Sequence, residues 1–236
     1  MDEQLTDESD PASTEAKPSA QIPAGALAIL PLRNAVLFPY TVMPLTVGRP
    51  SSLLAVDAAV RQQLPIGVVV QRESATEAPQ NKDLYEIGTT GDIFRMSPAR
   101  GGQRQVIVQG RQRFKILELL QTEPFLIART LLCDESVPRS KEFEARIMHL
   151  REQASKTLSL LPQPSAELKS IIESIEDPVA LIDIIAPTLD IALGEKQEIL
   201  ETIDVEARLQ KVSAQLTRQI ELLELRQKIR AETKES

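Results

Sequence analysis

The sequence contains few of the residues from which metal sites, disulfides and nucleophilic active sites are built. Its 236 residues include one cysteine, Cys133, one histidine, His149, and no tryptophan. A single cysteine cannot close an internal disulfide, and with one histidine it cannot complete a zinc site. His149 lies in the charged stretch MHLRE, which is typical of a helix surface rather than of a catalytic triad. We therefore expect no catalytic residues, no metal, no cofactor and a reducing compartment, the cytoplasm.

The sequence also lacks the patterns of a membrane-spanning protein and of an ATP-binding protein. No apolar run approaches the roughly 18 residues that cross a bilayer, so no membrane-spanning helix is expected. No phosphate-binding loop GxxxxGK[ST] occurs, because Gly101 and Gly102 are not followed by a lysine. Asp134 and Glu135 follow Cys133, and their charges would raise the pKa of its thiol. The sequence thus predicts neither ATP binding nor a reactive cysteine.

Acidic residues predominate. Asp and Glu number 34 against 27 Lys and Arg, a net charge of −7, which argues against nucleic acid or an anionic membrane as the main partner. Six acids and one lysine fall within the first twenty residues. Such a segment buries too little surface to offset its ordering entropy. We predict that residues 1–21 form a disordered acidic tail.

The aromatic residues divide the remaining chain in two. All seven lie between Phe38 and Phe143, and the last 93 residues contain none. In the first part, turn residues separate short β-branched runs, and a helical pattern extends from Pro50 to Leu64. The expected strands are 26–32, 42–47, 66–71, 86–97, 103–110, 113–120 and 124–132, with Gly110 as a break between two of them. Pro44 favours an edge strand or a bulge at 42–47. The pattern predicts a closed or nearly closed β-barrel with one inserted helix over residues 22–134.

The second part has helical periodicity. We expect helices over 140–161 and 165–175, the second capped by Ser165, and another opening at Asp177-Pro178. Leu193-Gly194 indicates a turn. From Asp204 onward no proline or glycine interrupts the chain, which predicts one helix of about 30 residues, roughly 45 Å long. The fold class is therefore α+β, with a helical bundle over 140–236 that ends in a long helix.

Several ordered segments resemble the N-terminal (PUA-like) domain of the ATP-dependent Lon protease family. That family opens with L-P-L-R, an apolar stretch into F-P, and P-L-x-V-x-R before a helix. The matching residues are Leu30, Pro31, Leu32, Arg33, Phe38, Pro39, Pro44, Leu45, Val47 and Arg49. Further matches keep their order: IGVVVQ, LYEIGTTGDI, VQGRQRFKI, IEDPVALIDIIAP, LGEKQEILETIDVEARL and IELLELRQKIR. The resemblance covers about residues 22–235.

The resemblance implies a PUA-like β-barrel followed by a helical bundle, as the residue pattern also suggests. In the full-length family this region precedes a coiled coil, an ATPase and a serine–lysine protease domain. It helps to select unfolded or degron-bearing proteins for degradation in protein quality control, and it supports assembly of a homo-oligomer, a hexamer. The implied role is non-catalytic substrate recognition and assembly. The alternative is a free-standing adaptor or holdase of the same fold.

Two surfaces are candidates for these roles. The proline-interrupted segment LFPYTVM suggests a polypeptide-binding site at Phe38, Pro39, Tyr40 and Met43, although Phe38 and Met43 would equally serve as barrel core. Beyond Ile220 the long helix has less bundle to cover it, so Leu222, Leu223, Leu225 and Ile229 are candidates for contact with another subunit.

A run of basic residues raises one alternative, RNA binding. Between Arg95 and Lys115 the chain has six basic residues and no acid, and Arg111, Arg113 and Lys115 are expected to share a strand face. The same pattern fits a solvated hairpin that carries protective edge charges. Because the chain is acidic overall, we favour the hairpin and consider nucleic acid an unlikely partner.

Overall fold

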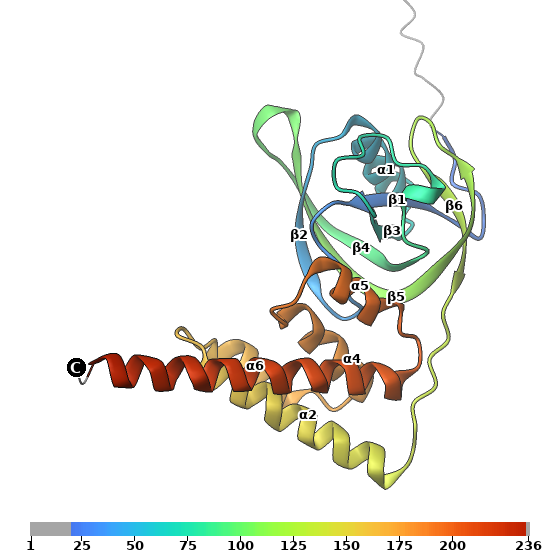
Figure 1. Ribbon diagram of the computed structural model, residues 1–236. Coiled ribbons are helices and arrows are strands. Elements are labelled where there is room, and N and C mark those ends of the chain that lie inside the picture. Colours follow the sequence, from blue (N-terminus) through green and yellow to red (C-terminus); the bar gives the residue numbers. More distant parts are fainter. Residues whose placement is uncertain (1–19, 235–236) are drawn as a thin grey trace, which may run out of the picture.

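The computed structural model describes residues 20–234, which form a strand-rich part followed by a helical part (Figure 1). The predicted acidic tail lies outside these residues, except for its last two. The strand-rich part comprises β1 Ala26–Leu32, β2 Val42–Val47, α1 Pro50–Arg61, β3 Ile66–Val70, η1 Asn81–Asp83, β4 Ile87–Pro98, η2 Arg100–Gly102, β5 Arg104–Gln121 and β6 Ile127–Leu132. The helical part comprises α2 Lys141–Leu160, α3 Ala166–Ser174, α4 Pro178–Ile185, η3 Ala186–Thr188, α5 Leu193–Glu201 and α6 Val205–Lys234.

The strands form one mixed sheet in the order β2-β5-β4-β3-β1-β6. β1 and β3 are parallel, and the other pairs are antiparallel. An additional β5–β6 pairing links the last strand back to β5, so the sheet curls on itself (Figure 1). The inserted helix α1 packs against β1 and β3. The α+β class is confirmed, and so is the edge position of the strand that contains Pro44, because β2 ends the strand order.

The expected strand break at Gly110 is wrong. β5 runs without interruption from Arg104 to Gln121, and Gly110 lies within it. The segment before β2 lies alongside β5 here: the Tyr40 N–H donates to the Gly110 carbonyl at 3.0 Å, and the Gly110 N–H donates to the Thr41 carbonyl at 2.8 Å. A Cβ on Gly110 would lie 2.2 Å from the Phe38 carbonyl oxygen. Glycine is therefore needed for close approach of two backbones rather than for a turn.

The expected helix caps are present, but one expected turn is the start of a helix. The Ser165 hydroxyl accepts from the Leu168 N–H, and the Asp177 carboxylate accepts from the Val179 and Ala180 N–H groups. Pro50 and Pro178 each occupy the first helical turn, as expected. The turn expected at Leu193-Gly194 is instead the start of α5, since Leu193 is its first residue.

Two long helices, α2 and α6, form the frame of the helical part (Figure 1). Buried Gln153 of α2 joins them: its amide nitrogen donates to the Thr217 hydroxyl at 2.8 Å, and its amide oxygen accepts from the Ser213 hydroxyl at 2.7 Å. Because a buried amide needs such partners, these bonds specify the axial register of α6 on α2.

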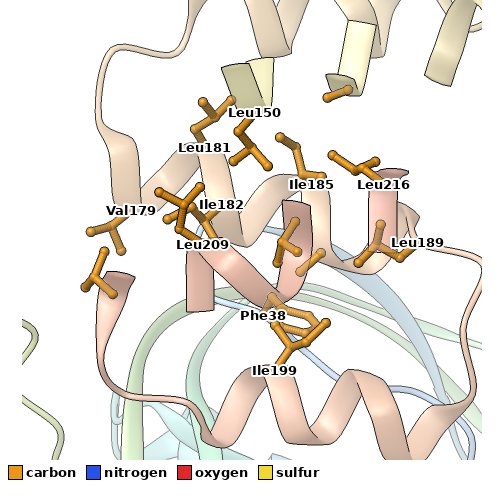
Figure 2. Packing of buried hydrophobic residues seen from close by; sticks show 14 of the residues in the cluster. Phe38, Leu150, Val179, Leu181, Ile182, Ile185, Leu189, Ile199, Leu209 and Leu216 are labelled. Carbon is orange, nitrogen blue, oxygen red and sulfur yellow. The ribbon is translucent and has the colours of Figure 1, made fainter. Parts of the chain in front are cut away.

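The two parts share one apolar core. The largest buried cluster contains side chains of α2 to α6 together with Val36, Phe38 and Val70 of the strand-rich part. Phe38 lies beside Ile199 of α5, on the side of the helical core that faces the sheet (Figure 2). A fully buried phenylalanine contributes about 1.5–3 kcal/mol through lost water contact. The connection after β1 therefore anchors the helices onto the sheet.

A buried ion-pair network also crosses between the parts. Arg113 of β5 is 0% exposed and donates through both terminal nitrogens to Asp183 of α4, at 2.6 and 2.7 Å. Its Nε donates to the Leu200 carbonyl at 2.8 Å. Glu135 accepts from Arg113 and from Arg208 of α6, which is also completely buried. Two arginines and two carboxylates thus balance in charge, which a buried site requires.

We predict strong coupling between Arg113 and Asp183. Arg113→Met and Asp183→Leu should each lower the free energy of unfolding by about 3–5 kcal/mol, because each leaves a buried charge without its closest partner. The double variant keeps the Arg208–Glu135 pair and should cost clearly less than the sum of the two single variants. Urea unfolding of the four proteins measures the cycle, and additive costs would contradict the coupling.

A second prediction concerns the close approach of the Phe38 backbone to Gly110. Gly110→Ala should destabilise the chain by about 1–3 kcal/mol, because the methyl group meets backbone that cannot move aside. Gly194→Ala is the matched control: nothing lies within 4 Å of its Cβ position, and alanine favours the α5 helix. Thermal unfolding should therefore show a lower Tm for the first variant and an equal or higher Tm for the second.

Candidate polypeptide-binding site

The predicted binding residues divide between core and surface. Phe38 is 0% exposed, and Pro39 is also buried, so in this conformation neither offers surface to a partner. Tyr40 is 43% exposed, and Met43 of β2 is partly exposed. Phe38 enters the helical core rather than the interior of the sheet, while Met43 packs at the edge of the sheet's own core. The binding hypothesis therefore depends on Tyr40 and Met43.

Tyr40 has a left-handed backbone, with φ of 64°. Such a conformation in a non-glycine residue costs on the order of 1 kcal/mol and persists only where the surroundings impose it. Here the imposing contacts are its hydrogen bond to Gly110 and the Thr41 hydroxyl, which donates to the Phe38 carbonyl at 2.7 Å. Phe38 is thereby turned inward and the Tyr40 ring is left at the surface.

The charges of the ion-pair network affect the Tyr40 phenol. Partial burial raises the pKa of the Tyr40 phenol, and the carboxylates of Asp177, Asp183 and Glu135 raise it further, while Arg113 opposes them. At neutral pH the phenol thus stays protonated and can donate a hydrogen bond. Tyr40 combines an apolar ring with a donor, the type of side chain that protein interfaces use most.

Met43 lines a cleft of about 230 Å³ between the strand-rich and helical parts. Its apolar lining consists of Ala35, Val36, Met43, Pro187, Ile191 and Leu193. Asn34 and Lys196 add polar groups, and the Lys196 ammonium donates to the Pro187 carbonyl at 3.0 Å. The cleft could hold one or two apolar side chains of an extended chain, since methionine adapts its shape to irregular partners.

The side chains that could bind a metal ion or act as nucleophiles form no site of their own in the described part of the chain. Within residues 20–234, no cluster of three or more His, Cys, Asp or Glu side chains is arranged to hold a metal ion. His149 is exposed on α2, as expected. Burial raises the pKa of the Cys133 thiol, and Glu135 and Asp134 add to this effect, while Arg113 and Lys115 oppose it. The expected direction is correct, but desolvation rather than the neighbouring acids is the main cause.

The predicted assembly residues on α6 also divide. Leu223 is 9% exposed and belongs to the buried face, whereas Leu222, Leu225 and Ile229 are each more than half exposed. At 100° per residue, these three form a stripe about 140° around the helix from the buried face. Among residues 20–234, no helix combines the length and the hydropathy that a membrane span requires.

The basic run between Arg95 and Lys115 is not a free phosphate-binding stripe. Arg104 pairs with Asp57, Arg111 with Asp92, and Lys115 with Glu86. The expected shared solvated face is wrong for Arg113, because the helical part covers β5 at this residue. Sequence reasoning missed the buried network, although one signal was present: Asp183 is the only acid in the otherwise apolar run PVALIDIIAP.

Comparison with known proteins assigns the family. Residues 26–218 match the family described as the ATP-dependent protease La (LON) substrate-binding domain. The chain is 42% identical over 211 residues to the Lon protease of Methylocella silvestris, covering 89% of this chain and 26% of that protein. It is 39% identical over 233 residues to the Lon protease of Paraburkholderia phytofirmans, covering 98% and 29%. The chain therefore spans about a quarter of the length of these relatives.

Solved structures show the same fold. The N-terminal domain of a Mycobacterium avium complex Lon protease superposes with a TM-score of 0.69 at 18% identity, covering 81% of this chain and 98% of that one. A Lon N-terminal domain protein from Xanthomonas campestris gives a TM-score of 0.56 at 19% identity, covering 80% and 97%. The matched segment corresponds to the substrate-binding part of a Lon protease and not to its ATPase or protease parts, so the chain belongs to the family of Lon substrate-binding domains.

Proposed function

We propose that this chain is the non-catalytic part of an ATP-dependent Lon-type protease that binds unfolded or degron-bearing polypeptides for degradation. The observation that carries the proposal is the exposed, conformationally constrained Tyr40, three residues before Met43, which lines an apolar cleft. Both residues lie where the strand-rich and helical parts meet, so the site needs both parts in place. Unfolded clients expose apolar side chains, and these are what such a surface can accept.

The expected binding is weak and tolerant of sequence. Burying apolar surface contributes about 25 cal/mol per Å², while association carries a large entropic cost. A cleft of about 230 Å³ offers few contacts, and the ammonium of Lys196 in its lining is already engaged by the Pro187 carbonyl. Low affinity suits a domain that must accept many clients and then release them to an ATP-driven unfoldase.

We further propose that Leu222, Leu225 and Ile229 contact another subunit of an oligomer, the hexamer that the resemblance implies. Their exposure supports this, because three apolar side chains at a spacing of three and four residues fit against a neighbouring surface. The ATPase and protease parts of the same protein are the other expected partners, and the cytoplasm is the compartment we propose.

Polar replacement at the site tests the proposal. Tyr40→Asn combined with Met43→Gln should weaken binding to a denatured, fluorescently labelled protein by roughly 5- to 30-fold, because apolar contact is lost. Asparagine tolerates the left-handed backbone, so folding should be preserved. Phe94→Asn combined with Met148→Gln makes the matched change at exposed side chains elsewhere and should leave the affinity unchanged. Equal affinity of both double variants would remove Tyr40 and Met43 from the site.

Assembly is tested separately. Leu225→Gln combined with Ile229→Gln should lower the concentration-dependent mass measured by light scattering, because the apolar stripe is removed while the buried face of α6 stays intact. Stability should change by no more than about 0.5 kcal/mol, as is usual for exposed positions. A mass that is identical for parent and variant at every concentration would rule out this stripe as the contact of the isolated chain.

A further inference from the structure

A larger groove lies along the opposite end of the helical part from the buried ion-pair network. It has a volume of about 540 Å³ and runs between α6, the C-terminal end of α2 and the turn that precedes α5. Its apolar lining consists of Leu160, Leu161, Pro162, Ile191, Leu222 and Leu223. The groove therefore offers more than twice the volume of the cleft at Met43.

Three arginines of α6 also line this groove, namely Arg218, Arg226 and Arg230. The spacings of eight and four residues place them along one side of the helix. Among the described residues none of the three makes an ion pair, although other basic residues of the bundle do: Arg146 pairs with Glu206, and Lys156 with Glu224. The groove thus combines an apolar lining with positive charges that no ion pair among residues 20–234 neutralises.

The acidic lining is confined to one end. Asp190 and Glu195 border the groove near the start of α5, and the Glu195 carboxylate accepts from the Ala192 N–H at 2.9 Å. At the other end the charged side chains that line the groove are Arg226 and Arg230. An occupant would therefore place its negative charges toward the C-terminal end of α6, where no lining carboxylate competes.

We propose that this groove binds an extended polypeptide segment that carries both apolar and acidic side chains. The inference rests on the proposed function and assigns it a preferred class of client sequence. Apolar side chains of the client contact the leucines of the apolar lining, and its carboxylates pair with the arginines at the rim. A second copy of α6 fits less well, because residues 218–230 carry four basic and two acidic side chains and would face their own charge.

The arginines of the groove make it selective for acidic over basic segments. Each exposed ion pair adds little affinity, and salt screens it, so several must act together with the apolar contact. A segment with lysines in place of the acids would keep the apolar contact but meet repulsion. Selection against basic segments is thus the property that distinguishes this groove from a purely apolar surface.

Two labelled peptides of about 15 residues test the proposal with the complete 236-residue chain. One alternates leucine with aspartate and glutamate, and the other has lysine at every acidic position. Fluorescence anisotropy should show that the acidic peptide binds at least about tenfold more tightly, and this preference should disappear in 1 M salt, where the Debye length falls to about 3 Å. Arg226→Glu combined with Arg230→Glu should weaken the acidic peptide by roughly 5- to 30-fold and strengthen the basic one.

Arg95→Glu combined with Arg100→Glu is the matched control, since it makes the same change in net charge at exposed residues of the β4–η2 region. Equal binding of both peptides, or equal effects of the two double variants, would overturn the proposal. So would a groove variant that changes the mass seen by light scattering and leaves peptide affinity unaltered, which would assign the groove to a second copy. If denatured protein still binds through Tyr40 and Met43 while the peptides do not distinguish charge, this inference fails and the proposed function stands.

Discussion

Burial of the Arg113 guanidinium is the constraint on which the arrangement of this molecule depends. A guanidinium stays charged, and a charge without water is tolerated only where a carboxylate and further acceptors surround it. The acceptors are the Asp183 carboxylate of α4, the Glu135 carboxylate of the segment that follows β6, and the Leu200 carbonyl near the end of α5. Because these groups come from distant parts of the sequence, the helical part can satisfy Arg113 in one position against the sheet.

The same junction also contains the surface that we propose for client binding. Phe38 packs in the helical core rather than in the core of the sheet. The backbone after it is hydrogen-bonded to β5 at Gly110, and Tyr40 stays at the surface. The cleft at Met43 is closed on one side by Pro187, Ile191 and Leu193 of the helical part. Neither the strand-rich part nor the helical part alone contains this surface. The proposed recognition and the packing between the two parts therefore use neighbouring residues of one short connection.

Local sequence patterns predicted the elements well, because those patterns report local physics. The strands at 26–32 and 42–47, the helix after Pro50 and the caps at Ser165 and Asp177 follow from periodicity and capping chemistry. The errors concern contacts between distant segments. The pattern predicts a break at Gly110, because the sequence does not show how closely the Phe38 backbone approaches this residue. It predicts a solvated face for Arg113, because strand alternation does not show what covers that face.

The site was predictable only in part for the same reason. An apolar, proline-containing segment marked residues 38–43, but the separation of buried Phe38 from exposed Tyr40 depends on one left-handed residue. On α6, helical periodicity distinguishes two apolar faces, yet the groove beside them is made by the ends of α2 and α5, which only the tertiary structure brings together. That its arginines form no ion pair among the described residues likewise depends on neighbours that the sequence does not reveal.

The polar contacts between α2 and α6 have a mechanical consequence. Gln153 is bonded to Ser213 and Thr217, so sliding α6 by even one residue along its axis would break both bonds at once. α6 is also a single helix from Val205 to Lys234, without an internal proline or glycine. Tension applied at the Lys234 end of α6 would therefore act along the helix axis on the hydrogen bonds of Gln153. The force would pass to α2 and the rest of the bundle, because α6 has no internal break at which it could extend.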